Sequence, residues 1–405
     1  MANTILTHQM IAREAAVMLK ESVPFLTNIN RARESDFLTP INSIKKGTSV
    51  TIRVPADNVV YSGSIFAGGG SAPAQTELPV TLTINTQLHV PLTFTSIEKV
   101  LKIEDYRDRF IKPAINTLGA SVHANLLSQA IPLVPNLVGT AGSLPTAFKT
   151  WGYARSRLGD VLAPSSDRYA LISHDSNNEL TDTTKTLFTP TKDIGEQYLE
   201  GSLGRLQGLD FFETAALPSI TNGSTVSGVT VSGASQTGSN LVVGGVSSGN
   251  TWNAGQVFNI AGVYAVHPLT QTTLPWLRQF VVTANTTAST TTVTLPIYPS
   301  IVVGGSTNPG ATVSASPANS AALTFVGSAS TAYRQNLTYQ KDAFTAAFIP
   351  LPVLASCEGY TYNDDGFAVR VMTFGDGKND LENTRVDVLF GFAGVRPMHA
   401  CRVTE

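Results

Sequence analysis

The chain has 405 residues and a formal net charge of −2; 42% of its residues are hydrophobic and 14% are charged. This length predicts two or three domains, and the near-neutral charge excludes a global attraction to nucleic acid or to an anionic membrane. The two cysteines, Cys357 and Cys401, are too few for a disulfide framework, and their apolar strand-like flanks predict buried, reduced thiols.

The N-terminal stretch 1–25 has no basic start followed by an apolar run, so it is not a signal peptide. No stretch approaches the ~18 apolar residues of a membrane span. We therefore expect the chain to fold in a cytoplasm without a membrane anchor. Residues 4–22 are predicted to form an amphipathic helix that Pro24 ends. Its apolar face cannot be buried by the helix alone, so it is expected to dock on another surface.

Residues 36–97 change to the strand period of two, in TSVTIRVPA and LPVTLTINTQLHVPLTF. They predict a long two-stranded hairpin with a flexible tip at Gly68–Gly70. An isolated hairpin is marginally stable in water, so this one needs a neighbouring surface. The three glycines are not expected to hold phosphate, because no GK[ST] sequence follows them and no helix opens there.

Residues 103–131 give the strongest helix pattern, with Pro113 predicting a kink or a late start. At 1.5 Å per residue this helix would be roughly 40 Å long. A second helix is predicted at about 145–160, and DRYALISHDSNNEL predicts a buried strand, 169–172, that turns into a helix. Residues 193–217 predict a short helix, a loop and a strand around 209–213.

Residues 214–333 contain a single formally charged side chain, Arg278. Soluble surfaces normally carry many charges, so this stretch is predicted to be a separate unit. Its short β-rich segments, the last at 311–316, predict six strands and a compact, independent barrel. Charge and strand patterns return after Arg334. The barrel, residues 219–334, is therefore predicted to interrupt a discontinuous α+β domain formed by 98–218 and 335–405.

No catalytic, cofactor-binding or metal-binding residue is predicted. Ser173-His174-Asp175 cannot form a triad because neighbouring side chains diverge; Ser173 and Asp175 are better helix N-caps. The histidines lack metal-ligand spacing, and Asp376–Asp380 predicts a turn rather than a cation loop, as does Asp364-Asp365-Gly366. Small basic clusters have acidic neighbours, such as Glu34, Asp36, Asp105 and Asp108, that predict inter-subunit or local ion pairs. The clusters are Arg31/Arg33, Lys45/Lys46, Arg107/Arg109 and Arg155/Arg157.

Four strings, in this order, are similar to the major capsid protein of tailed bacteriophages, in the short-tailed-phage branch with an inserted β-barrel. They are AGQVFNIAGVYAVHPLT (254–270), RQFVV (278–282), LTYQKDAFTAAFIPLP (337–352) and TRVDVLFGFAGVRPMHACRV (384–403). The resemblance implies an α+β capsid fold. Its parts would be an N-terminal arm (1–35), an extended loop (36–97), a spine helix with the first part of the peripheral and axial domains (98–218), the barrel (219–334) and the remaining axial and peripheral part (335–405).

The resemblance also implies a role: self-assembly into an icosahedral shell of hexamers and pentamers through overlapping arm and extended-loop contacts. Its implied partners are other copies of the chain, a scaffolding protein, a portal protein and a decoration protein, with packaged DNA bound only non-specifically and no membrane. The implied location is the virion, after assembly in the bacterial cytoplasm. No cofactor or enzymatic activity is implied.

Two departures and two rival hypotheses accompany the resemblance. Barrels in this family can touch through a charged loop, whereas Arg278 alone cannot support such salt bridges. Lys45 and Lys46 lie at the base of the hairpin, so no crosslink to asparagine is expected. Removal of residues 1–22 is predicted to abolish assembly and leave a folded subunit. The alternatives are a surface adhesin or carbohydrate-binding β-module, and an enzyme of unrecognised class.

Overall fold

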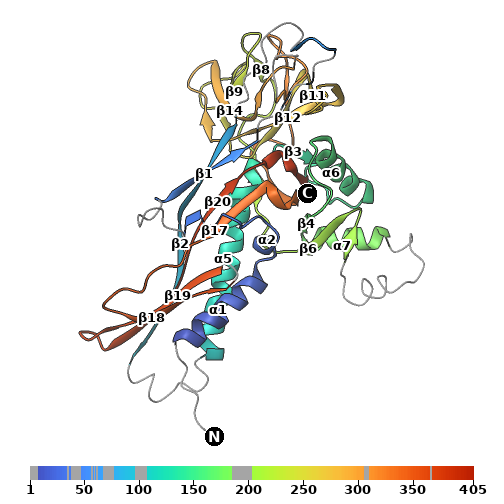
Figure 1. The fold of residues 1–405 in the computed structure, drawn as a ribbon. Coiled ribbons are helices and arrows are strands. Elements are labelled where there is room, and N and C mark those ends of the chain that lie inside the picture. The colour runs from blue at the N-terminus through green and yellow to red at the C-terminus, as the bar shows by residue number, and fades with distance from the viewer. Residues whose placement is uncertain are drawn as a thin grey trace. The chain divides into compact units, whose positions relative to one another are not determined.

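The computed structural model describes residues 8–33, 36–37, 47–55, 58, 60, 63–66, 77–95, 107–184, 203–304, 310–364 and 367–405. Figure 1 labels the elements. The chain forms two compact units, each assembled from separated stretches. The first consists of Met1–Ile52, Val80–Leu127 and Phe344–Ala393, and the second of Arg53–Pro79, Ser128–Ala343 and Gly394–Glu405. The mixture of helices and β-sheets confirms the predicted α+β class.

The predicted helices are present wherever the chain is described. Pro113 lies next to the first residue of α5, after a π-helical turn, which is the late start expected of a proline that cannot donate a backbone hydrogen bond. The short helix predicted after residue 193 lies outside the described residues. The helical elements are α1 (His8–Ser22), α2 (Pro24–Thr27), η2 (Arg107–Ile111), α5 (Lys112–Ala130), η3 (Ile131–Leu133), α6 (Phe148–Asp160), α7 (His174–Thr184), η4 (Lys341–Ala343) and η5 (Pro397–His399).

The first unit contains a six-stranded sheet of order β1-β2-β20-β19-β18, in which β17 also pairs with β20. Its strands are β1 (Ser49–Val54), β2 (Leu78–Thr95), β17 (Phe344–Phe348), β18 (Glu358–Asp364), β19 (Phe367–Asp376) and β20 (Leu381–Gly394). The β2–β20 ladder runs from Ile84 opposite Gly391 to Thr95 opposite Leu381. The predicted hairpin strands are confirmed, and the neighbour they needed is a strand of the same chain. The proposed glycine tip lies outside the described residues.

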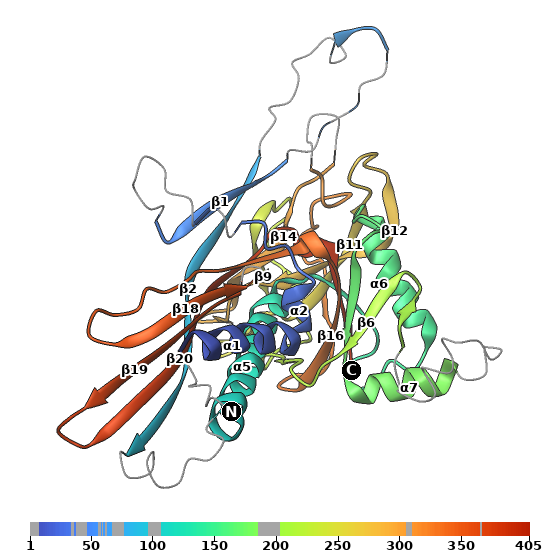
Figure 2. The ribbon, with the colours of Figure 1, turned by 60° about the horizontal axis from the view of Figure 1, so that its bottom comes forward.

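Helix α1 packs on β18 and β19, and it lies beside α5 in both views of the fold (Figures 1 and 2). Its apolar face is buried through Ile11, Ala12, Ala15 and Ala16, and the His8 Nε2 atom lies 2.9 Å from the Thr373 Oγ1 atom. The predicted docking of this helix is confirmed. The prediction that removal of residues 1–22 leaves a folded subunit stays a prediction, and the burial of this apolar face indicates that the deletion would also lower the stability of the sheet.

A buried charge network lies in the middle of this sheet. Asp387 on β20 is fully buried. Its carboxylate accepts hydrogen bonds from Arg370 Nη2 on β19 at 2.8 Å and from Arg385 Nε at 2.5 Å. Gln87 on β2 adds a third donor at 3.3 Å. Because a buried carboxylate is costly without paired donors, this network favours the observed strand order over alternatives.

The second unit contains a seven-stranded mixed sheet of order β3-β21-β16-β4-β6-β5, with β7 also paired to β16. Helix α6 covers it through Trp151, Ala154 and Leu158, which pack with Ile172 and Val403. The predicted strands at 169–172 and 209–213 are confirmed, whereas β3 and β21 were not predicted. The strands are β3 (Asn136–Val138), β4 (Arg168–Ile172), β5 (Arg205–Leu206), β6 (Leu209–Glu213), β7 (Ser219–Thr221), β16 (Ala332–Gln340) and β21 (Ala400–Thr404).

A second sheet of this unit closes on itself as a barrel. Its order is β15-β11-β12-β14-β9-β8. Its two edges meet where the Val231 N–H donates to the Ala321 carbonyl at 2.9 Å and the Leu323 N–H donates to the Val229 carbonyl at 3.0 Å. The strands are β8 (Thr230–Val231), β9 (Gly238–Gly244), β11 (Val257–Val266), β12 (Thr273–Val282), β14 (Thr292–Ile301) and β15 (Leu323–Phe325), beside a separate pair, β10 (Thr251–Trp252) and β13 (Thr286–Thr287).

The sixth barrel strand was predicted in the wrong place. The segment 311–316 makes only isolated bridges, through Val313, and β15 takes the place beside β11 instead. The Thr312 hydroxyl explains the difference. It donates to the Ser300 carbonyl at 2.6 Å and accepts from the Val302 N–H at 3.0 Å. A side chain therefore satisfies backbone groups that a ladder strand would otherwise pair.

The chain enters and leaves the barrel through one paired stem. Ser219, Ile220 and Thr221 of β7 pair with Arg334, Tyr333 and Ala332 of β16. The same strand β16 then runs into the seven-stranded sheet between β21 and β4. The barrel and this sheet belong to one compact unit, and the independence of the barrel stays a prediction.

We predict that Asp387→Asn lowers the stability of the first unit by about 3 kcal/mol, because Arg370 then stays buried without its counter-ion. The matched control is Asp36→Asn, which removes an exposed pair with Arg33 at 3.5 Å and is expected to cost less than about 1 kcal/mol. Urea denaturation of the subunit measures both. Equal losses in the two variants would show that the buried network contributes no more than a surface pair.

Acidification is predicted to destabilise the subunit. Burial lowers the pKa of His123 to about 4 and that of His399 to about 4. Because an unfolded histidine titrates near 6.5, the unfolded chain binds more protons between pH 6.5 and 4. Stability is then complete above pH 6.5 and falls toward pH 4. Denaturation midpoints at pH 7.5 and pH 5 test this, and His123→Leu is expected to reduce the difference; an unchanged difference contradicts the assignment to His123.

Candidate functional site

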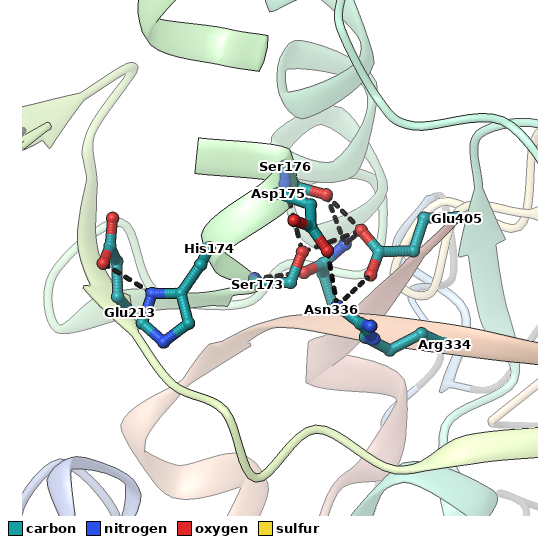
Figure 3. Close-up of polar contacts among 8 residues, drawn as sticks. All are labelled: Ser173, His174, Asp175, Ser176, Glu213, Arg334, Asn336 and Glu405. Atoms are coloured by element: carbon teal, nitrogen blue, oxygen red, sulfur yellow. Dashed lines mark hydrogen bonds and ion pairs between the residues drawn. The ribbon is translucent and has the colours of Figure 1, made fainter. Parts of the chain in front are cut away.

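The Ser173-His174-Asp175 sequence starts helix α7, and its three side chains go to three different partners (Figure 3). The Ser173 hydroxyl donates to the Glu405 carboxylate at 2.9 Å. His174 Nδ1 lies 2.8 Å from Glu213 Oε2, and Asp175 pairs with Arg334 at 3.2 Å. The serine and histidine therefore do not form a nucleophile–base pair. This agrees with the prediction from the sequence that these three neighbours form no triad.

Ser173 is the N-cap of α7, because its hydroxyl accepts the Ser176 N–H at 3.1 Å. The same small cluster contains buried Asn336 of β16, whose side-chain oxygen accepts the Ser173 N–H at 2.8 Å. Ser176 also donates to Glu405. The N-cap prediction is confirmed for Ser173 and is wrong for Asp175, which lies inside the first turn of α7. The cluster joins α7 to β16 and to the end of β21, so these side chains stabilise the fold.

Arg334 marks the point where the barrel stem meets this cluster. Its Nη1 atom lies 3.2 Å from Asp175 Oδ2 and 3.3 Å from Glu405 Oε1 (Figure 3). The Glu405 side chain is 5% exposed, whereas those of Arg334 and Asp175 are 44% and 62% exposed. One guanidinium thus bridges two acids on different elements and fixes the root of the stem.

Arg278, the only formal charge between residues 214 and 333, is buried in strand β12 at 1% exposure. Burial lowers its pKa to about 10. Trp276 on the same strand lies near it, with its ring centre 5.8 Å from the Arg278 guanidinium carbon. Among the described residues, the Nε and Nη2 atoms of Arg278 have no hydrogen-bond partner. The aromatic ring is thus the described group that faces this charge, and it offsets only part of the cost of burying it.

Trp276 also connects the barrel to helix α6. The Arg157 guanidinium carbon lies 3.6 Å from the ring centre, and the indole N–H donates to Asp160 Oδ2 at 3.1 Å. Arg157 belongs to a cluster that was predicted to form inter-subunit or local ion pairs, and within the described chain its guanidinium lies against this ring. The sequence had singled out Arg278, the first residue of the string RQFVV, as a lone charge. Trp276, two residues earlier, carried no signal that it would meet α6.

Gln279 and Arg402 make two further contacts between the barrel and the seven-stranded sheet. The Gln279 side chain accepts the Leu137 N–H and donates to the Leu137 carbonyl, both at 2.8 Å. Arg402 on β21 is 1% exposed and donates to the Gly255 carbonyl at 2.7 Å. Leu137, Val257 and Val281 form an apolar cluster at the same junction. The barrel is thus held by polar contacts inside an apolar contact area.

Apart from Arg334 at the root of the stem, the outer surface of the barrel carries no Lys, Arg, Asp or Glu, because residues 219–333 supply only Arg278 and that side chain is buried. Exposed positions there hold Ser, Thr, Asn and Gly, with half-exposed apolar residues such as Tyr264 at 41% and Leu269 at 57%. Such a surface can make hydroxyl, amide and apolar contacts, but no ion pairs.

The remaining motifs are structural where they are described. Asp376 accepts hydrogen bonds from Lys378 N at 3.1 Å and Asn379 Nδ2 at 2.6 Å, and the Asn379 contact lowers its pKa. This is the predicted turn. Within the described ranges, no group of His, Cys, Asp or Glu could hold a metal ion. The Asp364–Gly366 turn lies partly outside the described residues.

The two cysteines are free thiols, as predicted, but only Cys401 is buried. Burial raises the pKa of the Cys401 thiol to about 12. Cys357 is half-buried and lies just before β18, the last strand in the order of its sheet. Arg33 forms the predicted local pair with Asp36, and Arg31 stacks 4.6 Å from the Phe367 ring centre. Lys45, Lys46, Glu34, Asp105 and the Asp108 side chain lie outside the described residues. No described helix is long and apolar enough to span a membrane.

Comparisons with known proteins were made for both sequence and structure. No curated protein sequence matches the chain. Among solved structures, one from Mycobacterium phage Che8 is 11% identical, covering 93% of this chain and 89% of its own, with a TM-score of 0.47. The capsid of a native GTA particle is 8% identical over 89% and 85%, with a TM-score of 0.46. That of cyanophage P-SCSP1u is 11% identical over 89% and 84%, with a TM-score of 0.42.

The sequence itself gives the stronger finding. Residues 11–402 match the model of a family described as P22 coat protein, gene protein 5. The match includes the four strings on which the resemblance was based and spans both compact units. The chain therefore belongs to the P22 coat protein family, and it is a phage major capsid protein that associates with itself to build the icosahedral shell of a virion.

Proposed function

We propose that the chain acts as a purely structural subunit, forms the hexamers and pentamers of the shell, and carries its barrel as a rigid, uncharged module on the outer surface. The observation that supports rigid attachment most directly is the junction in which Trp276 and Gln279 of the barrel contact Asp160 and Leu137, and Arg402 of the seven-stranded sheet contacts Gly255. A barrel tethered by a flexible linker would not need buried polar contacts of this kind.

The proposed division of labour follows the five predicted segments. The arm (1–35) and extended loop (36–97) overlap neighbouring subunits. The segments 98–218 and 335–405 form the body of the subunit, and 219–334 forms the barrel. The paired stem of β7 and β16 supports an insertion at these bounds, because the chain enters and leaves through adjacent strands. On α1, Met10 at 46% and Val17 at 41% exposure remain available to a neighbour after the helix has docked.

The proposed partners besides other copies are a scaffolding protein, a portal protein and a decoration protein on the shell, with assembly in the host cytoplasm. Packaged DNA would be bound only non-specifically, since the net charge of −2 provides no general attraction to phosphate. Contacts between barrels, where they occur, would use hydroxyl, amide and apolar groups. The separated side chains of Ser173, His174 and Asp175 support the absence of an enzymatic role.

Overexpression of the full chain tests the assembly proposal. We expect closed shells or open tubular polyheads in electron micrographs of the purified protein, because the subunit should contain the contacts for its own lattice. Co-expression with a scaffolding protein should raise the fraction of closed shells. A chain that stays monomeric under both conditions, while circular dichroism shows it folded, would contradict the proposal.

Because the barrel is proposed to be rigidly attached, we predict that Gln279→Ala loosens the stem formed by β7 and β16. This change leaves the buried N–H and C=O groups of Leu137 without partners, at a cost of about 2 kcal/mol. We expect faster hydrogen exchange in the stem segments Ser219–Thr221 and Ala332–Arg334. Gln236→Ala is the control, because Gln236 bonds only within its own barrel loop. Unchanged exchange in the stem after Gln279→Ala would show that the junction does not restrain the barrel.

A further inference from the structure

The second unit contains a cavity whose walls come from all three stretches of chain that make up this unit. Its volume is about 300 Å³, at the small end of the roughly 300–1,000 Å³ that ligand pockets span. Three large apolar side chains line it while remaining exposed: Leu78 at the start of β2, Leu162 after α6 and Leu269 between β11 and β12, at 58%, 41% and 57%. Exposed apolar side chains that gather in one place are typical of binding surfaces.

The charge in the wall of this cavity is positive. Arg396 lines it half-buried, and among the described residues its guanidinium makes no hydrogen bond and no ion pair. No aspartate or glutamate is among the described residues of the wall. Buried Arg278 adds to the positive potential, because both arginines act on the same wall residue, Tyr298. A guanidinium beside apolar groups is well suited to a carboxylate, which can accept two parallel N–H bonds.

A second polar group in the wall is an acceptor. His399 is 8% exposed, and its Nδ1 atom has no partner within the described chain. The ring makes a backbone hydrogen bond with Val161 that favours the protonated form, so the Val161 carbonyl accepts it. Burial lowers the pKa of His399 to about 4, so the ring is neutral at pH 7 and Nδ1 carries a lone pair. Arg168 and Asp342 also act on this ring, but both are hydrogen-bonded to other groups.

These three features together select one ligand chemistry. Arg396 calls for a carboxylate, His399 Nδ1 for an N–H or O–H donor, and the three leucines for large apolar groups. A polypeptide segment with an acidic side chain between apolar ones offers all three, because every residue except proline has a backbone N–H. An ionised fatty acid has a carboxylate and an apolar chain but no donor, and an inorganic anion has no apolar part.

We propose that this cavity binds a short segment of a partner protein in which a glutamate or aspartate lies between large apolar residues. The carboxylate pairs with Arg396, and a backbone N–H of the segment donates to His399 Nδ1. The flanking side chains cover the three exposed leucines. This peptide site goes beyond the proposed function and does not depend on it, because the cavity lies within one unit of a single chain.

Isothermal titration calorimetry on unassembled full-length subunits tests the site with three probes. The first is the capped peptide acetyl-Gly-Leu-Glu-Leu-Gly-amide, and the second has glutamine in place of glutamate. We expect the glutamate peptide to bind at least tenfold more tightly, because hydrogen bonds to a charged group are the stronger ones. The third probe is octanoate, an apolar carboxylate without an N–H donor, and it should bind more weakly than the glutamate peptide.

Variants of exposed residues place the peptide in the cavity. Arg396→Gln should weaken the glutamate peptide about tenfold and leave the glutamine peptide unchanged. Leu269→Asp should abolish binding of the glutamate peptide, because it puts a like charge and a polar group in the wall. The matched controls lie outside the cavity, Arg109→Gln on η2 and Leu354→Asp before β18, and should bind like the parent chain. Circular dichroism checks that each variant is folded.

The outcomes separate the alternatives. Equal affinities of the parent chain for the two peptides, or no binding at millimolar peptide, overturn the inference whether or not a variant folds. Octanoate that binds as tightly as the glutamate peptide would assign the cavity to a small amphiphile instead. Unchanged binding in folded Arg396→Gln would show that the peptide binds elsewhere. Closed shells in micrographs of the parent chain leave the proposed function standing in each of these cases.

Discussion

The pairing of β2 with β20 is the contact on which the first unit depends. It joins residues about 300 positions apart, such as Gln87 and Asp387. Once these strands are side by side, β19 and β18 follow by local hairpins, and the sheet presents the surface that α1 covers. Closing so long a loop is unfavourable in entropy. A ladder of this length, with a buried carboxylate between two arginines, provides the compensating interactions.

The second unit differs, because its buried charges lie near the junction of the barrel with the seven-stranded sheet and α6. Arg278 and Arg402 are both about 1% exposed, and burial lowers the pKa of each. Each retains a contact that an aliphatic residue could not make: an aromatic ring for Arg278 and the Gly255 carbonyl for Arg402. A buried charge destabilises a fold when its partner is removed. Loss of such a contact should therefore lower the stability of this unit more than the loss of an apolar contact of the same size.

The sequence predicted local features well and distant ones poorly. The helix α1, the late start of α5 at Pro113 and the strand β6 all depend on neighbours within a few residues, where periodicity and proline geometry decide. The pairing of the predicted hairpin with β20 depends on residues far away, and a repeating pattern does not identify a partner strand. β15 was missed because three residues, Leu323–Phe325, are too few to show alternation.

The candidate functional site shows the same difference between local features, which the sequence predicts, and distant contacts, which it does not. Ser173 was recognised as an N-cap because capping is local. Its bond to Glu405 could not be predicted, because it joins residues 232 positions apart. Arg278 stood out in the composition as a lone charge, but composition does not distinguish an exposed charge from a buried one. The structure shows that this residue is buried and that both Arg278 and Arg157 lie near the Trp276 ring.

The distribution of charge then separates two surfaces with different roles. The barrel has a surface without formal charges, so its contacts carry little electrostatic selectivity and little dependence on ionic strength. The six-stranded sheet does carry exposed charges, among them Arg53 on β1, which pairs with Glu77, and Glu358 on β18. Association steered by charge favours correct partners and disfavours like-to-like pairing. A shell subunit meets many identical copies during assembly. Selectivity is therefore most useful at the charged surfaces of the subunit, and a neutral barrel does not compete with them.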